Sequence, residues 1–287
     1  MRLGFGLIER TGGVMADEAR PDWAPPGVDT KRANVARIYD YWLGGTHNFL
    51  ADQDVGRAIA AVEPKIRAIA QTNRAFLGRA VRFLAASGID QFLDLGSGIP
   101  TSGNVHEIAQ QADPGARVVY VDVDPVAIAH SKAILAGNDK AAIVDADLRE
   151  PEKILAHDTV RHLIDFSRPV GLIVLAVFHF VGDDENPRQI MATLRDALAP
   201  GSYLVLGHAT DDGARPKVAQ AAERVYNRSV ATQVHLRSRA EILRLFDGFD
   251  LVEPGLVYTT TWRPDSPGDV SGDLTEYGTV AGVARKL

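Results

Sequence analysis

From residue 88 onward, short apolar runs alternate along the chain with longer stretches whose apolar residues follow helical spacing. Short apolar runs bounded by turn residues are typical of buried strands. Strands alternating with helices predict a parallel sheet joined by right-handed crossovers, and therefore a three-layer α/β sandwich. The predicted strands are 91–95, 117–122, 141–145, 170–177 and 203–207, and the predicted helices are 104–112, 125–136, 151–157, 187–198, 216–229 and 238–245.

The two ends of the chain have different patterns. Residues 1–30 are rich in Gly, Pro and Asp, which predicts a disordered extension. Residues 31–87 carry helical spacing throughout, with Asp29 or Thr30 as the expected first cap, and should form a helical cap before the core at 88–263. Pro264 opens a Gly/Asp/Ser-rich tail, 264–287, which we expect to be ordered only if it docks.

Two apolar runs precede that tail, at 249–252 and 256–262, with Glu253-Pro254-Gly255 between them. So short a separation with turn residues predicts an antiparallel hairpin. Added to the five parallel strands, this hairpin gives a mostly parallel, seven-stranded sheet with an antiparallel C-terminal strand.

A glycine-rich turn follows the first predicted strand. This strand ends near Asp94, and Gly96-Ser97-Gly98 comes next, ahead of the helix predicted from residue 104. Glycine lets a backbone turn sharply and lets a ligand approach closely, because no Cβ intervenes. Strand, glycine turn and helix in this order form the first half of a nucleotide-binding βαβ unit.

Carboxylates end the next two predicted strands. Asp122 lies 24 residues beyond Gly98, about the spacing at which a nucleoside-binding fold places an acid on the ribose hydroxyls. Asp124 precedes Pro125 and serves equally well as a helix N-cap or as a ligand contact. Asp145 and Asp147 close the third strand. Because ligands bind outside the carboxyl ends of parallel strands, these acids predict a nucleoside site.

The composition of the chain excludes several classes of protein. The 287 residues include 31 basic and 37 acidic ones, with a net charge of −6, and form no basic cluster of the kind that binds nucleic acid. No apolar run approaches the length that spans a bilayer, and no signal peptide is expected because Glu9 interrupts the N-terminal apolar residues. The absence of cysteine excludes disulfides and thiol catalysis and favours a cytoplasmic location.

These motifs resemble those of class I S-adenosylmethionine-dependent methyltransferases over residues 88–263, which implies a Rossmann-like fold. A closer likeness from residue 31 is to a bacterial methyltransferase-like family long catalogued as a domain of unknown function. One departure is Pro100, where the general pattern has a third glycine. The closer likeness rests on Ile38-Tyr39-Asp40-Tyr41-Trp42-Leu43-Gly44-Gly45-Thr46-His47-Asn48, Gly103-Asn104-Val105-His106-Glu107, Tyr120-Val121-Asp122-Val123-Asp124-Pro125 and Gly201-Ser202-Tyr203-Leu204-Val205-Leu206-Gly207-His208.

The resemblance implies S-adenosylmethionine as cofactor. Asp94 would accept from the methionine ammonium and Asp122 from the ribose hydroxyls, while Asp147, preferred over Asp145, would receive the adenine amine. The residues expected to bind the cofactor are Asp94, Gly96, Ser97, Gly98, Asn104, Asp122, Val123, Asp147, Leu148, Ala176, Asn48 and Arg74. Asn48 serves equally well in helix packing.

The sequence does not single out a catalytic base. His179, His208 and Tyr39 are candidates, although each suits a structural role at its position. The histidines have no metal-ligand spacing, so no metal is expected. We therefore predict methyl transfer to a small-molecule acceptor, with no nucleic acid or membrane partner. The alternatives are a non-catalytic protein that binds S-adenosylmethionine or S-adenosylhomocysteine and, less favoured because the third glycine is missing, an NAD-dependent oxidoreductase.

Overall fold

A computed structural model of the chain describes residues 21–100, 103–212, 216–266 and 278–287. Its strands form one sheet in the order β3-β2-β1-β4-β5-β8-β6, with β7 also pairing with β8. The first five strands are parallel, and β8 is antiparallel to β5. The strands are β1 (Gln91–Leu95), β2 (Arg117–Asp122), β3 (Ala141–Asp145), β4 (Gly171–Leu175), β5 (Tyr203–Ala209), β6 (Asp250–Leu251), β7 (Val257–Tyr258) and β8 (Thr279–Arg285).

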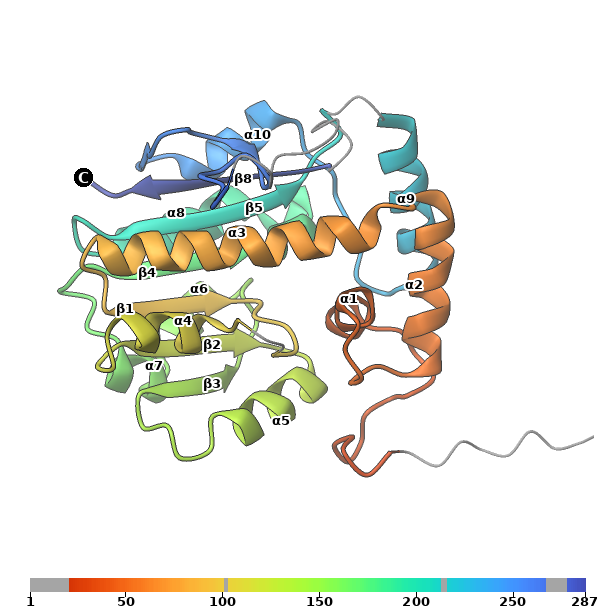
Figure 1. Cartoon of the computed structure of the whole chain (residues 1–287), viewed down its shortest axis with the longest axis horizontal. Helices are drawn as coiled ribbons and strands as arrows, with labels where there is room; N and C mark the ends of the chain where they lie inside the picture. The colour runs from red at the N-terminus through yellow and green to blue at the C-terminus, as the bar shows by residue number, and fades with distance from the viewer. Residues whose placement is uncertain (1–20, 101–102, 213–215, 267–277) are drawn as a thin grey trace, which may run out of the picture.

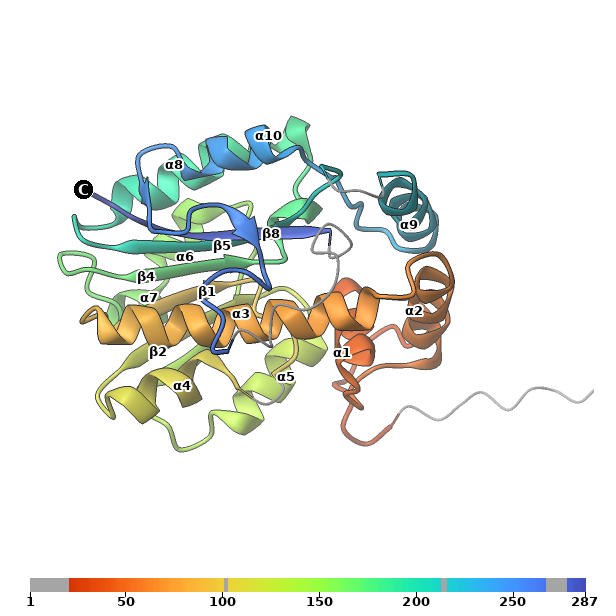
Figure 2. The ribbon, with the colours of Figure 1, turned by 45° about the horizontal axis from the view of Figure 1, so that its top comes forward.

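Helices cover both faces of this sheet (Figures 1 and 2). The first layer contains α3 (Ile66–Ala86), α4 (Val105–Ala112) and α5 (Pro125–Ile134), and the second contains α6 (Pro151–Ala156), α7 (Asp158–Leu163), α8 (Pro187–Ala197) and α10 (Arg239–Leu243). Successive residues of β1 point to opposite layers: Phe92 packs in one apolar cluster, and Leu93 packs in the other. The predicted three-layer sandwich with a mostly parallel sheet is confirmed.

The remaining long helices, α1 (Val35–Leu43), α2 (Leu50–Val62) and α9 (Pro216–Ser229), gather beyond the carboxyl ends of the parallel strands (Figure 1). They share a small apolar cluster of their own that includes Ile38, Trp42, Ile59 and Tyr226. The side chain of Asn34 caps α1 by accepting from the N–H of Ala36, so neither of the predicted caps holds this position.

The predicted C-terminal hairpin is wrong in its pairing. β6 and β7 each pair antiparallel with β8, which lies in the predicted tail. β8 also pairs along the whole of β5, from Tyr203↔Arg285 to Ala209↔Thr279. A seven-residue ladder satisfies far more backbone groups than a short hairpin, which explains why the distant strand takes this place. β8, at the end of the predicted tail, is therefore part of the central sheet.

Several predicted boundaries shift for local reasons. Residues 1–20 of the predicted extension lie outside the described part of the chain, whereas residues 21–30 form turns in which Ala24 is buried and Trp23 stacks on Phe49 at 5.0 Å. Strand β4 is shorter than predicted because Ala176 adopts a left-handed backbone, with φ of 55°. The helix predicted at 151–157 is α6, and α7, which follows it after His157, was not predicted.

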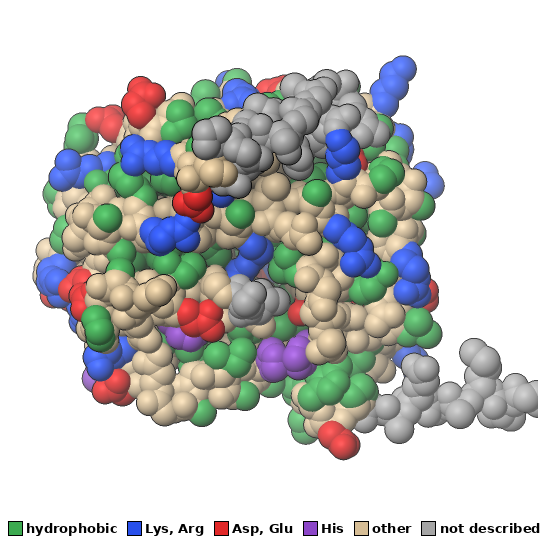
Figure 3. Space-filling model, in the orientation of Figure 1, with side chains coloured by type: hydrophobic (Ala, Val, Ile, Leu, Met, Phe, Trp, Pro, Cys, Tyr) green, Lys and Arg blue, Asp and Glu red, His purple; other side chains and the backbone are tan. Residues whose placement is uncertain are grey.

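Acidic and basic side chains are intermixed over the face shown in Figure 3. Within the residues that the structure describes, no helix has the length and apolar character needed to cross a bilayer.

Candidate active site

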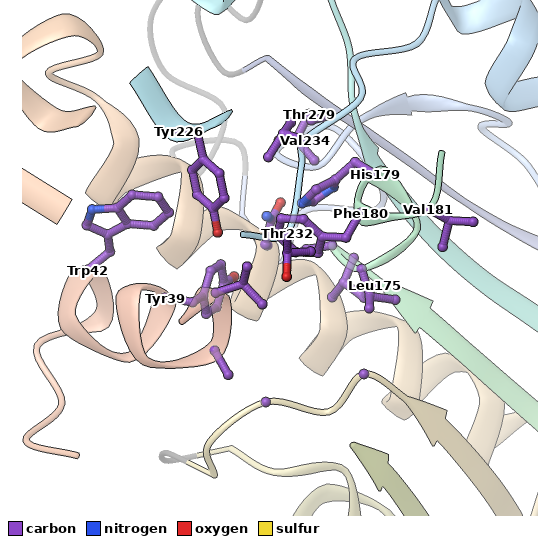
Figure 4. Close-up of a pocket in the computed structure, with 18 of the residues that line it drawn as sticks. Tyr39, Trp42, Leu175, His179, Phe180, Val181, Tyr226, Thr232, Val234 and Thr279 are labelled. Atoms are coloured by element: carbon purple, nitrogen blue, oxygen red, sulfur yellow. The ribbon is translucent and has the colours of Figure 1, made fainter. Parts of the chain in front are cut away.

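A cavity lies at the carboxyl edge of the sheet, between the ends of β1–β4 and the helices α1, α3 and α9 (Figure 4). It contains most of the residues predicted from the sequence. Those in its lining are Arg74, Asp94, Gly96, Ser97, Gly98, Asp122, Val123, Asp147, Leu148 and Ala176, together with the catalytic candidates Tyr39 and His179. Asn48, Asn104 and His208 are not in the lining.

The turn after β1 requires glycine for two different reasons. Gly96 has φ of 69°, and a Cβ there would lie 2.3 Å from a methyl carbon of Val177. Gly98 has φ of 67°, but no atom lies within 4 Å of where its Cβ would be. Gly96 therefore fits closely against the end of β4, while Gly98 leaves open space at the edge of the cavity.

Asp122 has a role that the sequence did not reveal. One oxygen of its carboxylate accepts from the N–H of Gly98 at 2.7 Å, and the other accepts from the N–H groups of Val123 and Asp124 at 2.8 and 2.9 Å. Burial raises the pKa of Asp122, and these N–H groups oppose that effect. The carboxylate thus fixes the glycine turn, while the oxygen facing Gly98 keeps capacity for another donor.

Asp94 is a buried carboxyl group whose pKa responds to the charges of Arg74 and Asp122. Burial raises its pKa to about 7; the guanidinium of Arg74 opposes this shift, and the carboxylate of Asp122 adds to it. Arg74 also donates to the carbonyl oxygen of Gly103 at 3.2 Å. A cation bound beside Asp94 would therefore restore the charged carboxylate.

The third strand contributes Asp147 rather than Asp145 to the cavity, and Asp145 is exposed. Arg149 pairs with the Asp147 carboxylate through two guanidinium nitrogens. Partial burial raises the pKa of Asp147, but the hydrogen bonds from Arg149 outweigh burial and leave it below its usual value. Nearby, Val123 lines the cavity with 55% of its surface exposed, and Leu148 lies beside Asp147.

Asp124 is the N-cap of α5. Its carboxylate accepts from the N–H groups of Val126 and Ala127 at 2.9 and 3.0 Å, and the guanidinium of Arg37 lies 3.9 Å away. The helix-cap interpretation of Asp124 is therefore confirmed. Asp124 also lines the cavity.

Asn48 and Asn104 have structural partners. The amide nitrogen of Asn48 donates to a carboxylate oxygen of Asp40 at 2.8 Å and to the carbonyl oxygen of Gly45 at 3.0 Å, which fixes the loop after α1. Asn104 begins α4, where its N–H donates to Glu107 at 2.8 Å. The structure brings neither side chain to the cavity.

The three catalytic candidates differ in their surroundings. His208 is buried between Ala209 and Arg237, outside the cavity lining. Tyr39 lines the cavity, but its hydroxyl donates to the carbonyl oxygen of Ala70, and burial raises its pKa to about 12, so it is a poor base. His179 lines the cavity, and its Nδ1 has no hydrogen-bond partner among the described residues.

Apart from Tyr39 and Arg74, the side chains on the far side of the cavity were not predicted from the sequence. This side is formed by α1, α3, α9 and the segment after α9, with side chains that include Trp42, Asn73, Tyr226, Thr232 and Val234 (Figure 4). Helical spacing indicated that most of these positions belong to packed elements. It did not indicate that α9 and α1, far apart in sequence, close over the strand ends together.

Fold and site together define a Rossmann-like protein with a cavity suited to a nucleoside-bearing ligand. The chain matches the family described as S-adenosyl methyltransferase over residues 21–287, and it belongs to that family. It is thus an S-adenosylmethionine-dependent methyltransferase, and S-adenosylmethionine is its cofactor.

Solved structures agree with the family. A crystal structure of a protein from Thermobifida fusca YX, provisionally described as a methyltransferase, is 43% identical, with a TM-score of 0.87 over 93% of this chain and 99% of that chain. A DUF574 family protein from Streptomyces avermitilis MA-4680 is 39% identical, with a TM-score of 0.87 over 90% and 99%. The predicted likeness to a family of unknown function is confirmed. No curated protein matches the chain.

The residues present suit this cofactor. A cationic ammonium group would balance Asp94, the open side of Gly98 leaves room for a ligand, and the apolar side chain of Val123 lies exposed where an adenine ring could cover it. The hydroxyl oxygen of Ser97 is buried without a hydrogen-bond partner among the described residues. A buried hydroxyl without a partner is unfavourable, so a ligand that supplied one would be stabilised.

Proposed function

We propose that the protein transfers a methyl group from S-adenosylmethionine to a small-molecule acceptor bound beneath α1 and α9. The observation that carries this proposal is that the cavity does not end at the cofactor residues. Its lining continues from Asp122 and Asp147 past Ala176 to Trp42 and Tyr226. A second molecule could therefore lie beside the cofactor.

We assign the cofactor contacts by position in the cavity. Asp94 receives the ammonium group, with Arg74 close enough to influence that carboxylate. Asp122 receives the ribose hydroxyls through the oxygen that also holds Gly98. Val123 and Leu148 pack against the adenine ring. Asp147 orients that ring at its edge, because Arg149 keeps the carboxylate ionised.

The protein contributes to the reaction mainly by holding the cofactor and the acceptor in position. When bound, the cofactor supplies an electrophilic methyl group on a positively charged sulfur. Leu175, Val177 and Phe180 give the cavity apolar walls beside Ala176. Such walls exclude water, and they suit a reaction in which charge disappears. Holding both molecules in line is the larger part of the expected rate enhancement.

The sequence also allowed a non-catalytic protein that binds the cofactor. It would be favoured if the chain's own aromatic side chains filled the acceptor side, but Trp42 and Tyr226 line that space as parts of its wall. We also place the reaction in the cytoplasm, on the sequence argument that the chain has no cysteine.

Calorimetric titration with S-adenosylhomocysteine tests the cofactor site. Wild-type protein should bind with micromolar affinity, and Asp122→Ala should bind at least about tenfold more weakly because hydrogen bonds to a charged group are lost. Asp145→Ala is the matched control, since Asp145 ends the neighbouring strand but is exposed and outside the cavity. Equal affinity in all three proteins would contradict the proposed site.

A further inference from the structure

The acceptor side of the cavity, which we call the acceptor chamber, is lined by Tyr39, Trp42, Ile59, Phe180, Tyr226 and Val234. In Figure 4, Tyr39 and Trp42 approach it from α1, and Tyr226 approaches from α9, opposite His179 and Phe180. Broad aromatic and aliphatic walls favour a ligand with a flat apolar body, because apolar surface leaves water when such a body binds.

Besides Oγ of Ser97 at the glycine turn, two polar atoms of the lining are buried without a hydrogen-bond partner among the described residues. They are Oδ1 of Asn73 and Nδ1 of His179. Asn73 is only 3% exposed, and its side chain lies close enough to Tyr39 to lower the pKa of that phenol slightly against the effect of burial. Oδ1 of Asn73 keeps its capacity to accept a hydrogen bond.

The carboxylates near the acceptor chamber also favour a ligand that donates hydrogen bonds. Glu63, at the end of α2, and Glu223, on α9, both line the cavity. Two carboxylates on this side disfavour an anionic ligand. Ionised carboxylates and Oδ1 of Asn73 can only accept hydrogen bonds, as can the unprotonated nitrogen of a neutral imidazole, whereas the hydroxyls of Tyr226 and Thr232 can donate or accept. A ligand that supplies donors therefore finds partners on this side.

We propose that the methyl acceptor is a mainly apolar, ring-containing molecule whose reacting hydroxyl donates its hydrogen to the imidazole of His179, while Oδ1 of Asn73 accepts from a second O–H or N–H group. This inference rests on the proposed methyl transfer. The hydroxyl oxygen forms a new bond to the methyl carbon as the carbon–sulfur bond breaks. The electron pair of the carbon–sulfur bond remains on sulfur. The hydroxyl proton passes to the imidazole and then to water.

The state of His179 fits this role. Burial, and then the neighbouring His208 and Arg237, lower its pKa well below the usual value, so the ring is neutral at pH 7. A neutral imidazole has one nitrogen that can accept a proton. His179 comes just after β4, three residues beyond Ala176, and both residues line the cavity.

The test compares two probes, 2-naphthol and 2-methoxynaphthalene, which differ in whether the oxygen carries a hydrogen. Each is titrated into protein saturated with S-adenosylhomocysteine, and binding is followed by naphthalene fluorescence. We expect 2-naphthol to bind wild-type protein about tenfold more tightly, the effect of roughly one hydrogen bond. Equal affinity of the two probes, or binding of neither, would overturn the inference even if a variant failed to fold.

Variants then separate the two residues. His179→Leu should remove the preference for 2-naphthol and also the naphtholate emission that arises when a neighbouring base takes the proton of the excited molecule. Asn73→Leu should weaken binding of probes with a second donor, such as 2,7-dihydroxynaphthalene, but keep the naphtholate emission. His162→Leu is the control, because His162 is exposed on α7 and is not in the cavity lining.

Cofactor binding distinguishes the two proposals. All three variants should retain wild-type affinity for S-adenosylhomocysteine, measured separately by calorimetry. If wild-type protein does not bind S-adenosylhomocysteine, the proposed cofactor site fails. If it does bind and the naphthol preference is absent or unchanged in His179→Leu, only the acceptor inference fails.

Discussion

A guanidinium nitrogen of Arg237 donates to Nε2 of His208 across 2.9 Å, and both side chains are buried. Nδ1 of His208 lies 2.6 Å from the carbonyl oxygen of Ala209, so the ring donates at Nδ1 and accepts at Nε2. Arg237 also donates to the carbonyl oxygens of Phe178 and Val181 at 3.2 and 2.8 Å. A neutral His208 on β5 therefore accepts a hydrogen bond from Arg237. Arg237 in turn links β5 to the segment after β4.

This arrangement predicts loss of stability in acid. Burial lowers the pKa of His208 to about 4, and the charge of Arg237 contributes, although the carbonyl of Ala209 opposes the shift. The unfolded chain, in which a histidine has a pKa of about 6.5, binds this proton more readily than the folded chain does. The stabilisation that neutral His208 provides is therefore complete above about pH 6.5 and is lost as the pH falls toward 4. The loss should reach about 3 kcal/mol.

Urea unfolding at pH values between 4 and 7.5 measures that loss. His208→Gln should show a flatter dependence of the unfolding free energy on pH, because the titrating group is gone. His162→Gln, at an exposed position, should follow the wild-type curve. Parallel curves for wild type and His208→Gln would contradict the prediction.

Gly98 and Gly88 offer a matched pair. Both have a left-handed backbone, with φ of 67° and 87°, and at neither site does any atom lie within 4 Å of the place that an alanine Cβ would occupy. Alanine at either site should cost about 1 kcal/mol of unfolding free energy. Only Gly98→Ala should weaken S-adenosylhomocysteine binding, by about tenfold or more, because only Gly98 lines the cavity. Similar calorimetric affinities for the two variants would place the cofactor elsewhere.

The raised pKa of Asp94 predicts that protons are released when the cofactor binds. With its pKa at about 7, this carboxyl is partly protonated in the free protein near neutral pH. An ammonium group beside it favours the ionised form, so its pKa falls and about half a proton should leave per site at pH 7. Calorimetry in buffers of different ionisation enthalpy measures the release. Asp94→Asn should lack this component, and an unchanged proton count in that variant would assign the release to another group.

Arg79 predicts a large stability difference from its neighbour Arg82. The buried guanidinium of Arg79 donates to the carbonyl oxygens of Thr259 at 2.6 Å and Trp262 at 2.9 Å. Arg79→Met should lower the unfolding free energy by about 2–4 kcal/mol, because these carbonyls lose a charged donor. Arg82→Met removes only an exposed pair with Asp265 and should cost less than about 1 kcal/mol. Urea denaturation measures the unfolding free energy of both variants. Similar decreases in the two variants would contradict the idea that Arg79 stabilises the segment 259–262.

The central strands could be predicted from the sequence because their signals are local. Apolar runs 91–95, 117–122 and 141–145 coincide with β1, β2 and β3, and each is followed by turn residues or acids. Order along the chain then places those ends at one edge of a parallel sheet. For the same reason Asp94, Asp122 and Asp147 could be expected in one cavity.

What could not be predicted depends on contacts between distant segments. The turn signal at 253–255 is real, yet the strands beside it pair with β8, whose residues follow a Gly/Asp/Ser-rich stretch. Likewise, nothing near Asn73 indicates that its amide oxygen lacks a partner, because that depends on how α1 and α3 pack. The bond from Gly98 to Asp122 is also invisible to motif spacing, which places the acid but not its hydrogen bonds.

The position of β8 affects how the chain can fold as it is made. Residues 250–258 leave the ribosome before residues 279–285, the strand with which β6 and β7 pair. Until then one edge of β5 is also unpaired, and an open strand edge can pair with other chains. The nascent chain therefore passes through an interval in which this strand edge is open to pairing with other chains, and that interval lengthens if translation of residues 259–285 is slow.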